Sequence, residues 1–402
     1  MKVLFVVSTF PALSETFILN QITGFLDEGH DVQILAMSKA AGKVHPDVER
    51  YQLMEKVTFV DIPKYTICKL ARAVKSFIQY PLPAMRTLNF LRYGKFVFSL
   101  RPLLTLQYLE NQSDYDTIIA HYGSNGLLLS ILEKDASANR FVFFHGNDLT
   151  GFVKRFGYKI YQPLFQSDIK ILPISNLWAD KLKLYGAYEQ KLQVHHMGVD
   201  VQRFPFLRPR HIGIGTSIKL LLVGRLTEKK GIDTALASVS LLKFFGYPVS
   251  LTIIGDGEMR EELELYTKDL QLDKVVHFTG WLRQTEVKRY IEEADIIVQP
   301  SRTAENGDME GIPVALMEVL AQGKLVVSTL HSGIPELIID GCNGLLVPEN
   351  DALALADKIE KLLQMSELDR GKMSENARKK IEKEFDIYKL NHRLMTMCGA
   401  KS

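Results

Sequence analysis

Residues 306–323 place two carboxylates around the start of a predicted helix. Glu310 precedes the helix and Glu318 lies on it, while Gly311 allows backbone to approach a ligand and Pro313 suits the first helical turn. The unpaired N–H groups of a helix N-terminus attract anions such as phosphate. At about 1.5 Å per residue, the carboxylates can stand up to about 12 Å apart. This reach fits hydroxyl groups on both sides of a diphosphate, as in a nucleotide sugar; the alternative is a capping acid followed by a solvated one.

Two loops that follow predicted strands carry further polar or flexible residues. In the loop from Gly224 to Gly231, Arg225 offers a planar fork for phosphate oxygens and Lys230 a point charge. These cations could equally be solvated. The next loop, at Gly255, reads first as a turn and second as a close approach to a ligand.

A third loop contains Trp281 and Arg283. Trp281 could border a nucleobase or simply pack against the protein.

Short apolar runs alternate with amphipathic stretches along the whole chain, which indicates an α/β fold with parallel sheets covered on both faces. The predicted strands are Val3–Val7, Val32–Ala36, Thr117–Ala120, Phe141–Phe144, Ile169–Ile174, Lys219–Val223, Val249–Ile254, Val275–Phe278, Ile296–Val298 and Leu325–Ser328. The pattern pauses between Gly198 and Ser217, where we expect a domain boundary. Ligands of such sheets bind at the carboxyl ends of the strands.

Composition limits the class of protein. A chain of 402 residues exceeds one ordinary core, so two domains are expected. Its 46% hydrophobic and 24% charged residues are typical of a globular protein, and a net charge of +2 gives no reason to expect nucleic acid as a partner. Three scattered cysteines indicate a reducing compartment without a zinc site. The apolar start is too short for a signal peptide or a membrane span, so we expect a cytoplasmic protein, at most attached to a membrane surface.

Several motifs occur together in a fixed order. They are Gly198-Val199-Asp200 with Phe204, Gly224-Arg225 with Lys230-Gly231, Gly255-Asp256-Gly257, Gln299-Pro300-Ser301, Glu310 through Glu318, and Ser332-Gly333-Ile334-Pro335-Glu336. With His145-Gly146-Asn147-Asp148, this set resembles the retaining glycosyltransferases of family four. The run 306–311, together with Phe10-Pro11 and residues 14–17, is most similar to the branch that builds bacterial exopolysaccharides of the colanic-acid type.

The resemblance implies the GT-B fold, in which two Rossmann-like domains face each other across a cleft. An acceptor domain would span residues 1–205, with a crossover helix at 385–402, and a donor domain would span 206–384. The reaction would be the metal-independent, retaining transfer of a hexose, with no cofactor. The donor would be a nucleotide sugar, with UDP favoured over GDP. The acceptor would be a saccharide, such as an undecaprenyl-diphosphate-linked oligosaccharide at the inner face of the plasma membrane.

The resemblance also implies roles for individual residues. Arg225 and Lys230 would neutralise the diphosphate, Glu318 would bind the ribose, Glu310 would bind the sugar, and His145 would lie near the transferred sugar. The implied donor-binding set is Gly224, Arg225, Lys230, Gly255, Trp281, Arg283, Glu310, Gly311, Ile312, Pro313, Val314 and Glu318. Stabilising the charge that grows on the leaving diphosphate is the main catalytic need, so the implied catalytic set is His145, Glu310, Arg225 and Lys230.

The first strand–helix loop departs from the family, because residues 8–16 contain no glycine. Ser14 could cap the following helix. Alternatively Ser14, Glu15 and Thr16 could contact the acceptor sugar. Both possibilities stay open.

Residues 62–109 contain no Asp or Glu but eight basic residues interleaved with aromatic ones. Such an amphipathic stretch could lie on an anionic membrane surface. It could also be a helical pair packed on the first domain with a solvated basic face.

Other functional classes fit the sequence less well than a transferase does. An epimerase of similar fold would need more carboxylates and histidines in the first half than His121 and His145, and a sugar-nucleotide-binding protein without catalysis is a third possibility. No G-x-G-x-x-G follows a strand, which disfavours a dehydrogenase. A hydrolase pair of Glu310 and Glu318 would need a separation of about 5–9 Å. Asp114 and Asp116 match the spacing of a metal-binding pair, but an acidic turn before a strand explains them.

Overall fold

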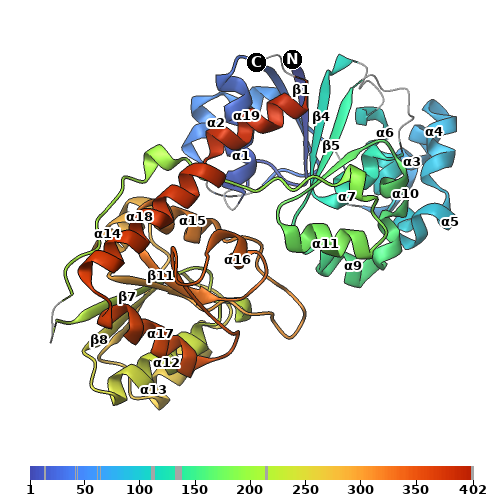
Figure 1. Cartoon of the computed structure of the whole chain (residues 1–402). Coiled ribbons are helices and arrows are strands. Elements are labelled where there is room, and N and C mark those ends of the chain that lie inside the picture. Colours follow the sequence, from blue (N-terminus) through green and yellow to red (C-terminus); the bar gives the residue numbers. More distant parts are fainter. Residues whose placement is uncertain are drawn as a thin grey trace. The chain divides into compact units, whose positions relative to one another are not determined.

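The computed structural model describes residues 1–12, 15–40, 42, 44–60, 62–63, 65–109, 114–131, 138–212 and 216–399. The chain forms two compact units, Met1–His196 with Ile387–Ser402 and Met197–Asp386 (Figure 1). Residues 197–205 therefore belong to the second unit rather than to the first.

In its described part, the first unit contains a parallel six-stranded sheet in the order β3-β2-β1-β4-β5-β6. The strands are β1 (Lys2–Val7), β2 (Asp31–Ala36), β3 (Val57–Phe59), β4 (Thr117–His121), β5 (Asn139–Phe144) and β6 (Lys170–Pro173). The central strand β1 pairs with β2 on one side and β4 on the other. Its run Val3–Val7 is buried, as the continuous apolar pattern predicts for a strand covered on both faces.

Helices cover this sheet. They are α1 (Thr16–Asp27), α2 (Pro46–Arg50), α3 (Thr66–Gln79), α4 (Pro81–Thr87), α5 (Phe90–Tyr93), α6 (Arg101–Leu109), α7 (Gly123–Leu129), α8 (Gly146–Leu149), α9 (Gly151–Phe156), α10 (Gln162–Gln166), α11 (Asn176–Leu184) and α19 (Ile387–Met397). The chain's last helix, α19, packs against α1, and Asn391 Nδ2 donates a hydrogen bond of 3.1 Å to the carbonyl of Asn20.

The second unit repeats the architecture, with a parallel sheet in the order β12-β11-β10-β7-β8-β9. Its strands are β7 (Ile218–Val223), β8 (Val249–Ile254), β9 (Val276–Gly280), β10 (Ile296–Gln299), β11 (Leu325–Thr329) and β12 (Leu345–Val347). Its helices are α12 (Ile232–Phe244), α13 (Arg260–Asp269), α14 (Gln284–Glu293), α15 (Val314–Ala321), α16 (Ile334–Leu337), α17 (Ala352–Gln364) and α18 (Glu367–Glu384).

Short 3-10 helices complete the described elements. They are η1 (Leu53–Lys56), η2 (Gly94–Ser99), η4 (Tyr158–Tyr161), η5 (Glu189–Lys191), η6 (Val201–Arg203) and η7 (Glu228–Lys230).

Both sheets have the strand order of a doubly wound fold, so the chain changes direction between β1 and β4 in the first and between β7 and β10 in the second. Loops diverge at such a switch point and leave room for a ligand at the carboxyl ends of the strands. The α/β prediction is confirmed, and the topology marks two places where functional residues should gather.

The segment that begins the second unit lies against the segment that ends it. The N–H of Val199 donates a hydrogen bond of 2.9 Å to the carbonyl of Phe385. Arg378, on α18, donates from Nη1 to the carbonyls of Phe204 at 2.5 Å and Ala321 at 2.7 Å. The motif Gly198-Val199-Asp200 with Phe204 is thus held by α18 at the place where the chain leaves the unit again.

Candidate functional site

The switch point of the second sheet brings together the loop after β7, residues 224–231, and the loop after β10, residues 300–313. Gly231 has a φ of +62°, and a Cβ atom there would lie 1.9 Å from the carbonyl oxygen of Pro300. Only glycine permits this contact without a shift of backbone. The two loops that carry most of the predicted site therefore touch.

Ion pairs connect the same two loops. Lys230 Nζ lies 3.2 Å from Glu310 Oε1, and Lys229 Nζ lies 3.0 Å from Asp308 Oδ2 and 3.9 Å from Glu310. Two residues predicted from separate motifs, Lys230 and Glu310, are thus direct neighbours.

Glu310 is buried, and its backbone is fixed on both sides. Its N–H donates a hydrogen bond of 3.1 Å to His331 Nε2, and its carbonyl accepts one of 2.6 Å from Ser332 Oγ. Among the described residues, none donates a hydrogen bond of acceptable geometry to its buried Oε1 atom. A buried carboxylate oxygen with spare acceptor capacity is suited to a hydroxyl group of a ligand.

His331 and Glu349 extend this network. His331 Nδ1 lies 2.6 Å from Glu349 Oε1, and Glu349 Oε2 accepts a hydrogen bond of 2.8 Å from the N–H of Thr303. Because Nε2 of His331 accepts from the backbone N–H of Glu310, Nδ1 is the ring atom that can donate to Glu349. Sequence reasoning missed His331, although it follows β11, a neighbour of β10 whose carboxyl end meets the same edge.

The two predicted phosphate ligands have different surroundings. Arg225 is exposed and makes no ion pair with any residue that the structure describes. Lys230 is largely buried, and a Cβ atom on Gly224 would lie 3.1 Å from its Cε atom. Gly224 therefore makes room for the lysine stem, and Arg225 offers its guanidinium group to solvent or to a ligand.

Glycines also bring the loops after β7, β8 and β9 together. Gly255 has a φ of +141°, and a Cβ atom there would lie 1.8 Å from the carbonyl oxygen of Gly224. Its N–H donates a hydrogen bond of 3.0 Å to the carbonyl of Gly280. The neighbouring backbone therefore explains this glycine, which lies in an isolated β-bridge with Gly280 rather than in a turn.

Trp281 follows Gly280 directly, and its side chain is 61% exposed. Arg283 is exposed as well, and its N–H donates a hydrogen bond of 3.0 Å to Glu286 Oε2 at the start of α14. Both side chains are accessible beside the loop of Gly255.

The helix predicted after Glu310 is α15. Its first helical residue is Val314, and Pro313, with φ −66° and ψ 121°, occupies the preceding N-cap position, one residue earlier than predicted. The extended ψ explains the difference, because it is outside the helical range. Ile312 and Pro313 are buried, whereas Gly311 and Val314 are partly exposed.

Glu318 lies in the second turn of α15 and is partly buried. Burial raises the pKa of its carboxyl group to about 7. Glu318 therefore lies on the helix that follows Glu310, as the sequence predicts.

Near the switch point of the first sheet, His121 ends β4 and His145 directly follows the neighbouring strand β5. His145 Nε2 lies 3.3 Å from His121 Nδ1, and the ring of His145 packs 4.7 Å from Tyr122 and 5.0 Å from Phe17, measured between centroids. Burial lowers the pKa of His145 to about 3. His145 is therefore a neutral imidazole that can exchange hydrogen bonds but does not supply a cation.

Tyr122 connects the loops after β1 and β4. Its backbone φ is +73°, an unfavourable value for a residue with a side chain, and its hydroxyl donates a hydrogen bond of 2.6 Å to Glu15 Oε1. Burial raises the pKa of Glu15, partly offset by this hydrogen bond. Sequence reasoning missed Tyr122, whose only signal is its place directly after a strand.

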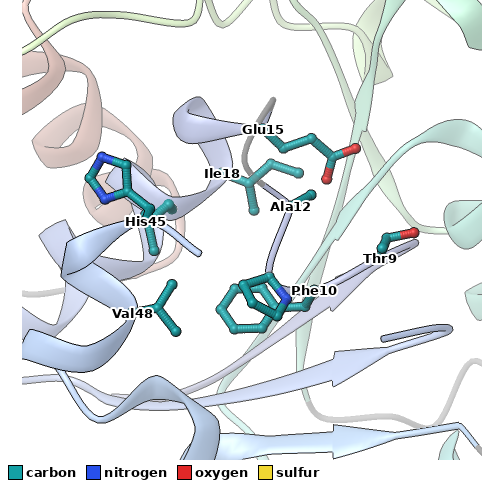
Figure 2. A pocket seen from close by; sticks show the side chains of 9 residues that line it. Thr9, Phe10, Ala12, Glu15, Ile18, His45 and Val48 are labelled. Atoms are coloured by element: carbon teal, nitrogen blue, oxygen red, sulfur yellow. The ribbon is translucent and has the colours of Figure 1, made fainter. Parts of the chain in front are cut away.

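A small pocket adjoins Glu15, lined also by Thr9, Phe10, His45 and Val48. Figure 2 shows Glu15 and His45 on opposite sides of it. Thr16, which begins α1, is partly exposed. Ser14, predicted as a helix cap or acceptor ligand, lies outside the described residues.

Asp116 stands apart from the switch point of the first sheet. It directly precedes β4, and its Oδ2 atom accepts a hydrogen bond of 2.7 Å from the N–H of Lys2 at the start of β1. This position is the amino end of the sheet, opposite to the ligand edge, which supports the structural interpretation of Asp114 and Asp116.

Known proteins are similar to this chain in sequence and in fold. The family model for glycosyl transferases group 1 matches residues 206–380. A protein named as a colanic acid biosynthesis glycosyltransferase, WcaL, of Salmonella typhimurium is 37% identical over 404 residues, which cover 99% of each chain. The amylovoran biosynthesis glycosyltransferase AmsK of Erwinia amylovora is 37% identical over 396 residues, 96% of each.

A solved structure shares the fold. The crystal structure of Anabaena Alr3699/HepE in complex with UDP superposes with a TM-score of 0.75 at 16% identity, covering 99% of this chain and 100% of that one. The same protein has been solved with UDP-glucose.

Proposed function

Because this chain belongs to the group 1 glycosyl transferase family and has its two-domain GT-B fold, we propose that it transfers a hexose from a nucleotide sugar to a saccharide acceptor in bacterial exopolysaccharide biosynthesis. The full-length similarity to the colanic acid and amylovoran glycosyltransferases supports the pathway. The acceptor in this proposal is a lipid-linked oligosaccharide, such as one carried on undecaprenyl diphosphate.

One observation carries the proposed donor site. Lys230 and Glu310 form an ion pair at the switch point of the second sheet, with Arg225 exposed beside them. In the proposed complex the diphosphate lies against Arg225, Lys230 and the start of α15. The buried Oε1 atom of Glu310 accepts a hydrogen bond from a hydroxyl of the sugar, and the carboxylate of Glu318 accepts hydrogen bonds from the ribose hydroxyls.

The proposed chemistry follows from the leaving group. A departing nucleoside diphosphate gains negative charge, which fixed cations and helix N–H groups stabilise. Arg225 and Lys230 provide this without a metal ion in our proposal. We further propose that the configuration is retained, through attack from the face that the diphosphate leaves. In this step the acceptor hydroxyl oxygen forms a bond to the anomeric carbon as the bond to the diphosphate breaks, and a phosphate oxygen of the donor takes the hydroxyl proton. The acceptor is thus itself the nucleophile, and no side chain takes that role in our proposal.

We propose UDP as the nucleoside diphosphate of the donor, because the structurally similar HepE was solved with UDP and with UDP-glucose. For the acceptor we propose the first unit, where Glu15 and Thr16 begin α1 beside the strained Tyr122. His145 contributes a neutral imidazole to the same edge. We place the reaction in the cytoplasm, against the inner face of the plasma membrane.

An assay of donor turnover tests the proposal against its alternatives. The chain is incubated with UDP-glucose or UDP-galactose, with and without a lipid extract from a polysaccharide-producing bacterium. A transferase releases UDP and labels the lipid fraction only when the extract is present. Interconversion of the free donor would instead identify an epimerase, and binding without either reaction would identify a binding protein.

A further inference from the structure

The helices α3 and α4 expose large apolar side chains that ordinarily lie in a core. On α3, Ile67 is 81% exposed and Ile78 75%, and Leu82 on α4 is 70% exposed. The exposed apolar residues of the two helices are Ile67, Leu70, Val74, Phe77, Ile78, Leu82 and Met85. We call this set the outer stripe. Because each helical residue advances by about 100°, its five members on α3 share one side of that helix.

The outer stripe is not the face by which these helices fold. Ala73 of α3 and Ala84 of α4 are buried in a cluster with Leu103, Leu104 and Leu106 of α6. The small side chains of α3 and α4 therefore point toward the unit, and the large ones point away from it. Figure 1 shows the three helices grouped at one side of the first unit. This arrangement reverses what burial of apolar area favours, unless something else covers the stripe.

The basic residues around the outer stripe indicate what kind of surface covers it. Residues 62–109 hold eight Lys and Arg and no Asp or Glu. Lys75 is exposed next to the outer stripe on α3, and Arg86 is exposed beside Met85 on α4. A second copy of this chain, packed face to face, would set these cations against their equivalents. An anionic lipid surface supplies both opposite charge and an apolar layer below it.

We propose that α3 and α4 dock on an anionic bilayer, with the outer stripe among the acyl chains at the interface and the Lys and Arg side chains at the lipid headgroups. In the part of the chain that the structure describes, no helix is long and apolar enough to cross a membrane. The proposed contact is therefore peripheral. It does not depend on the donor chemistry.

Vesicle co-sedimentation tests the surface. The full chain is mixed with phosphatidylcholine vesicles that contain about a third phosphatidylglycerol, or none, at low and high salt. We expect binding only to the anionic vesicles, weakened by salt. The affinity of the variant Ile67→Ser/Ile78→Ser/Leu82→Ser for these vesicles should fall by at least about tenfold. The variant Lys75→Glu/Arg86→Glu should also bind more weakly.

Matched controls change equally exposed residues elsewhere. Leu184→Ser/Phe244→Ser/Leu368→Ser removes side chains that are 84%, 83% and 68% exposed, and Lys274→Glu/Lys372→Glu reverses two exposed charges of the second unit. Both controls should bind vesicles like the unchanged protein. Unchanged circular dichroism and UDP affinity in every variant would show that folding and the donor site are intact.

Three results would overturn the docking proposal while leaving the proposed function standing: no binding to anionic vesicles, equal binding by the serine variant, or sedimentation of a dimer that the serine variant dissociates. Conversely, vesicle binding without UDP binding would support the docking surface and contradict the proposed function.

Discussion

His331 Nε2 accepts a hydrogen bond of 3.1 Å from the backbone N–H of Glu310, although 21 residues separate them. On its other side His331 contacts Glu349 at 2.6 Å. The side chain of His331 is fully buried and cannot reach solvent. We infer that His331 is a positioning residue, which fixes the backbone of Glu310 and thereby the direction of its carboxylate.

Replacing His331 tests this role. His331→Leu leaves the N–H of Glu310 without its acceptor, at a cost of about 1–3 kcal/mol in free energy of unfolding. We expect turnover to fall while UDP affinity changes little, since the cationic phosphate ligands, Arg225 and Lys230, lie on another loop. His331→Gln, which can restore an acceptor, should recover part of the turnover. Equal turnover in the leucine variant and the unchanged protein would remove His331 from the site.

The fold was largely predictable because buried parallel strands leave a strong signal. Each of the ten predicted strands overlaps an observed one. The two missed strands, β3 and β12, are three residues long and lie at sheet edges. Runs of this length carry no detectable period, and tertiary pairing rather than local sequence makes them strands.

The site was predictable only where motifs mark it. Arg225, Lys230 and Glu310 follow strands in recognisable order, and the sheet order then brings Lys230 and Glu310 into contact. His331 and Tyr122 are single residues without a motif. Their partners depend on which strands are neighbours, and sequence spacing does not reveal that. The helix begins at Val314, one residue after Pro313, because the exact end of a helix depends on backbone angles that the sequence motif does not reveal.

Glu310→Gln tests the proposed sugar contact. The amide keeps the shape of the side chain but loses the charge that pairs with Lys230. We expect turnover to fall on the order of 100-fold, as for loss of a group that acts in the transition state, while donor affinity falls only modestly. Asp308→Gln, which removes the neighbouring partner of Lys229, serves as control and should retain most turnover. Unchanged turnover in the Glu310 variant would exclude this residue from catalysis.

The pKa of Glu318 predicts a dependence of stability on pH. Burial raises this pKa from 4.5 to about 7, so the folded protein holds a proton there that the unfolded chain releases. The contribution of Glu318 to stability is therefore present below pH 4.5 and is lost as pH rises toward 7.

In the variant Glu318→Gln the side chain cannot ionise, so the loss of stability with rising pH should be absent. Without UDP, we expect the variant to gain on the order of 2 kcal/mol over the unchanged protein at pH 8, and little at pH 4.5. Urea unfolding at both pH values measures the difference. A constant difference between the two pH values would show that Glu318 does not titrate as its burial indicates. UDP affinity should decrease in the same variant.

Gly255→Ala tests the close contact between the loops after β7 and β8. The added Cβ atom would collide with the carbonyl of Gly224, so the loop that carries Arg225 must move. We expect a loss of more than about 2 kcal/mol in free energy of unfolding together with weaker UDP binding. Gly246→Ala, with a φ of +86° and open space around it, isolates the cost of backbone conformation, about 1 kcal/mol. Equal losses in the two variants would contradict the contact.

Glu15→Gln tests the proposed acceptor role of the first unit. Tyr122 can still donate its hydrogen bond to the amide oxygen, so folding should be preserved. We expect turnover with the lipid extract to fall about tenfold or more, with UDP affinity unchanged. Glu28→Gln, an exposed acid just after α1, is the control. If both variants turn over like the unchanged protein, the acceptor contacts other residues.

The most direct test of the donor site is a crystal structure of this chain with UDP. Our account predicts that the diphosphate oxygens lie within about 3 Å of the side chains of Arg225 and Lys230, and that the ribose hydroxyls contact Glu318. Well-ordered UDP bound away from residues 224–231 and 310–318 would contradict the account.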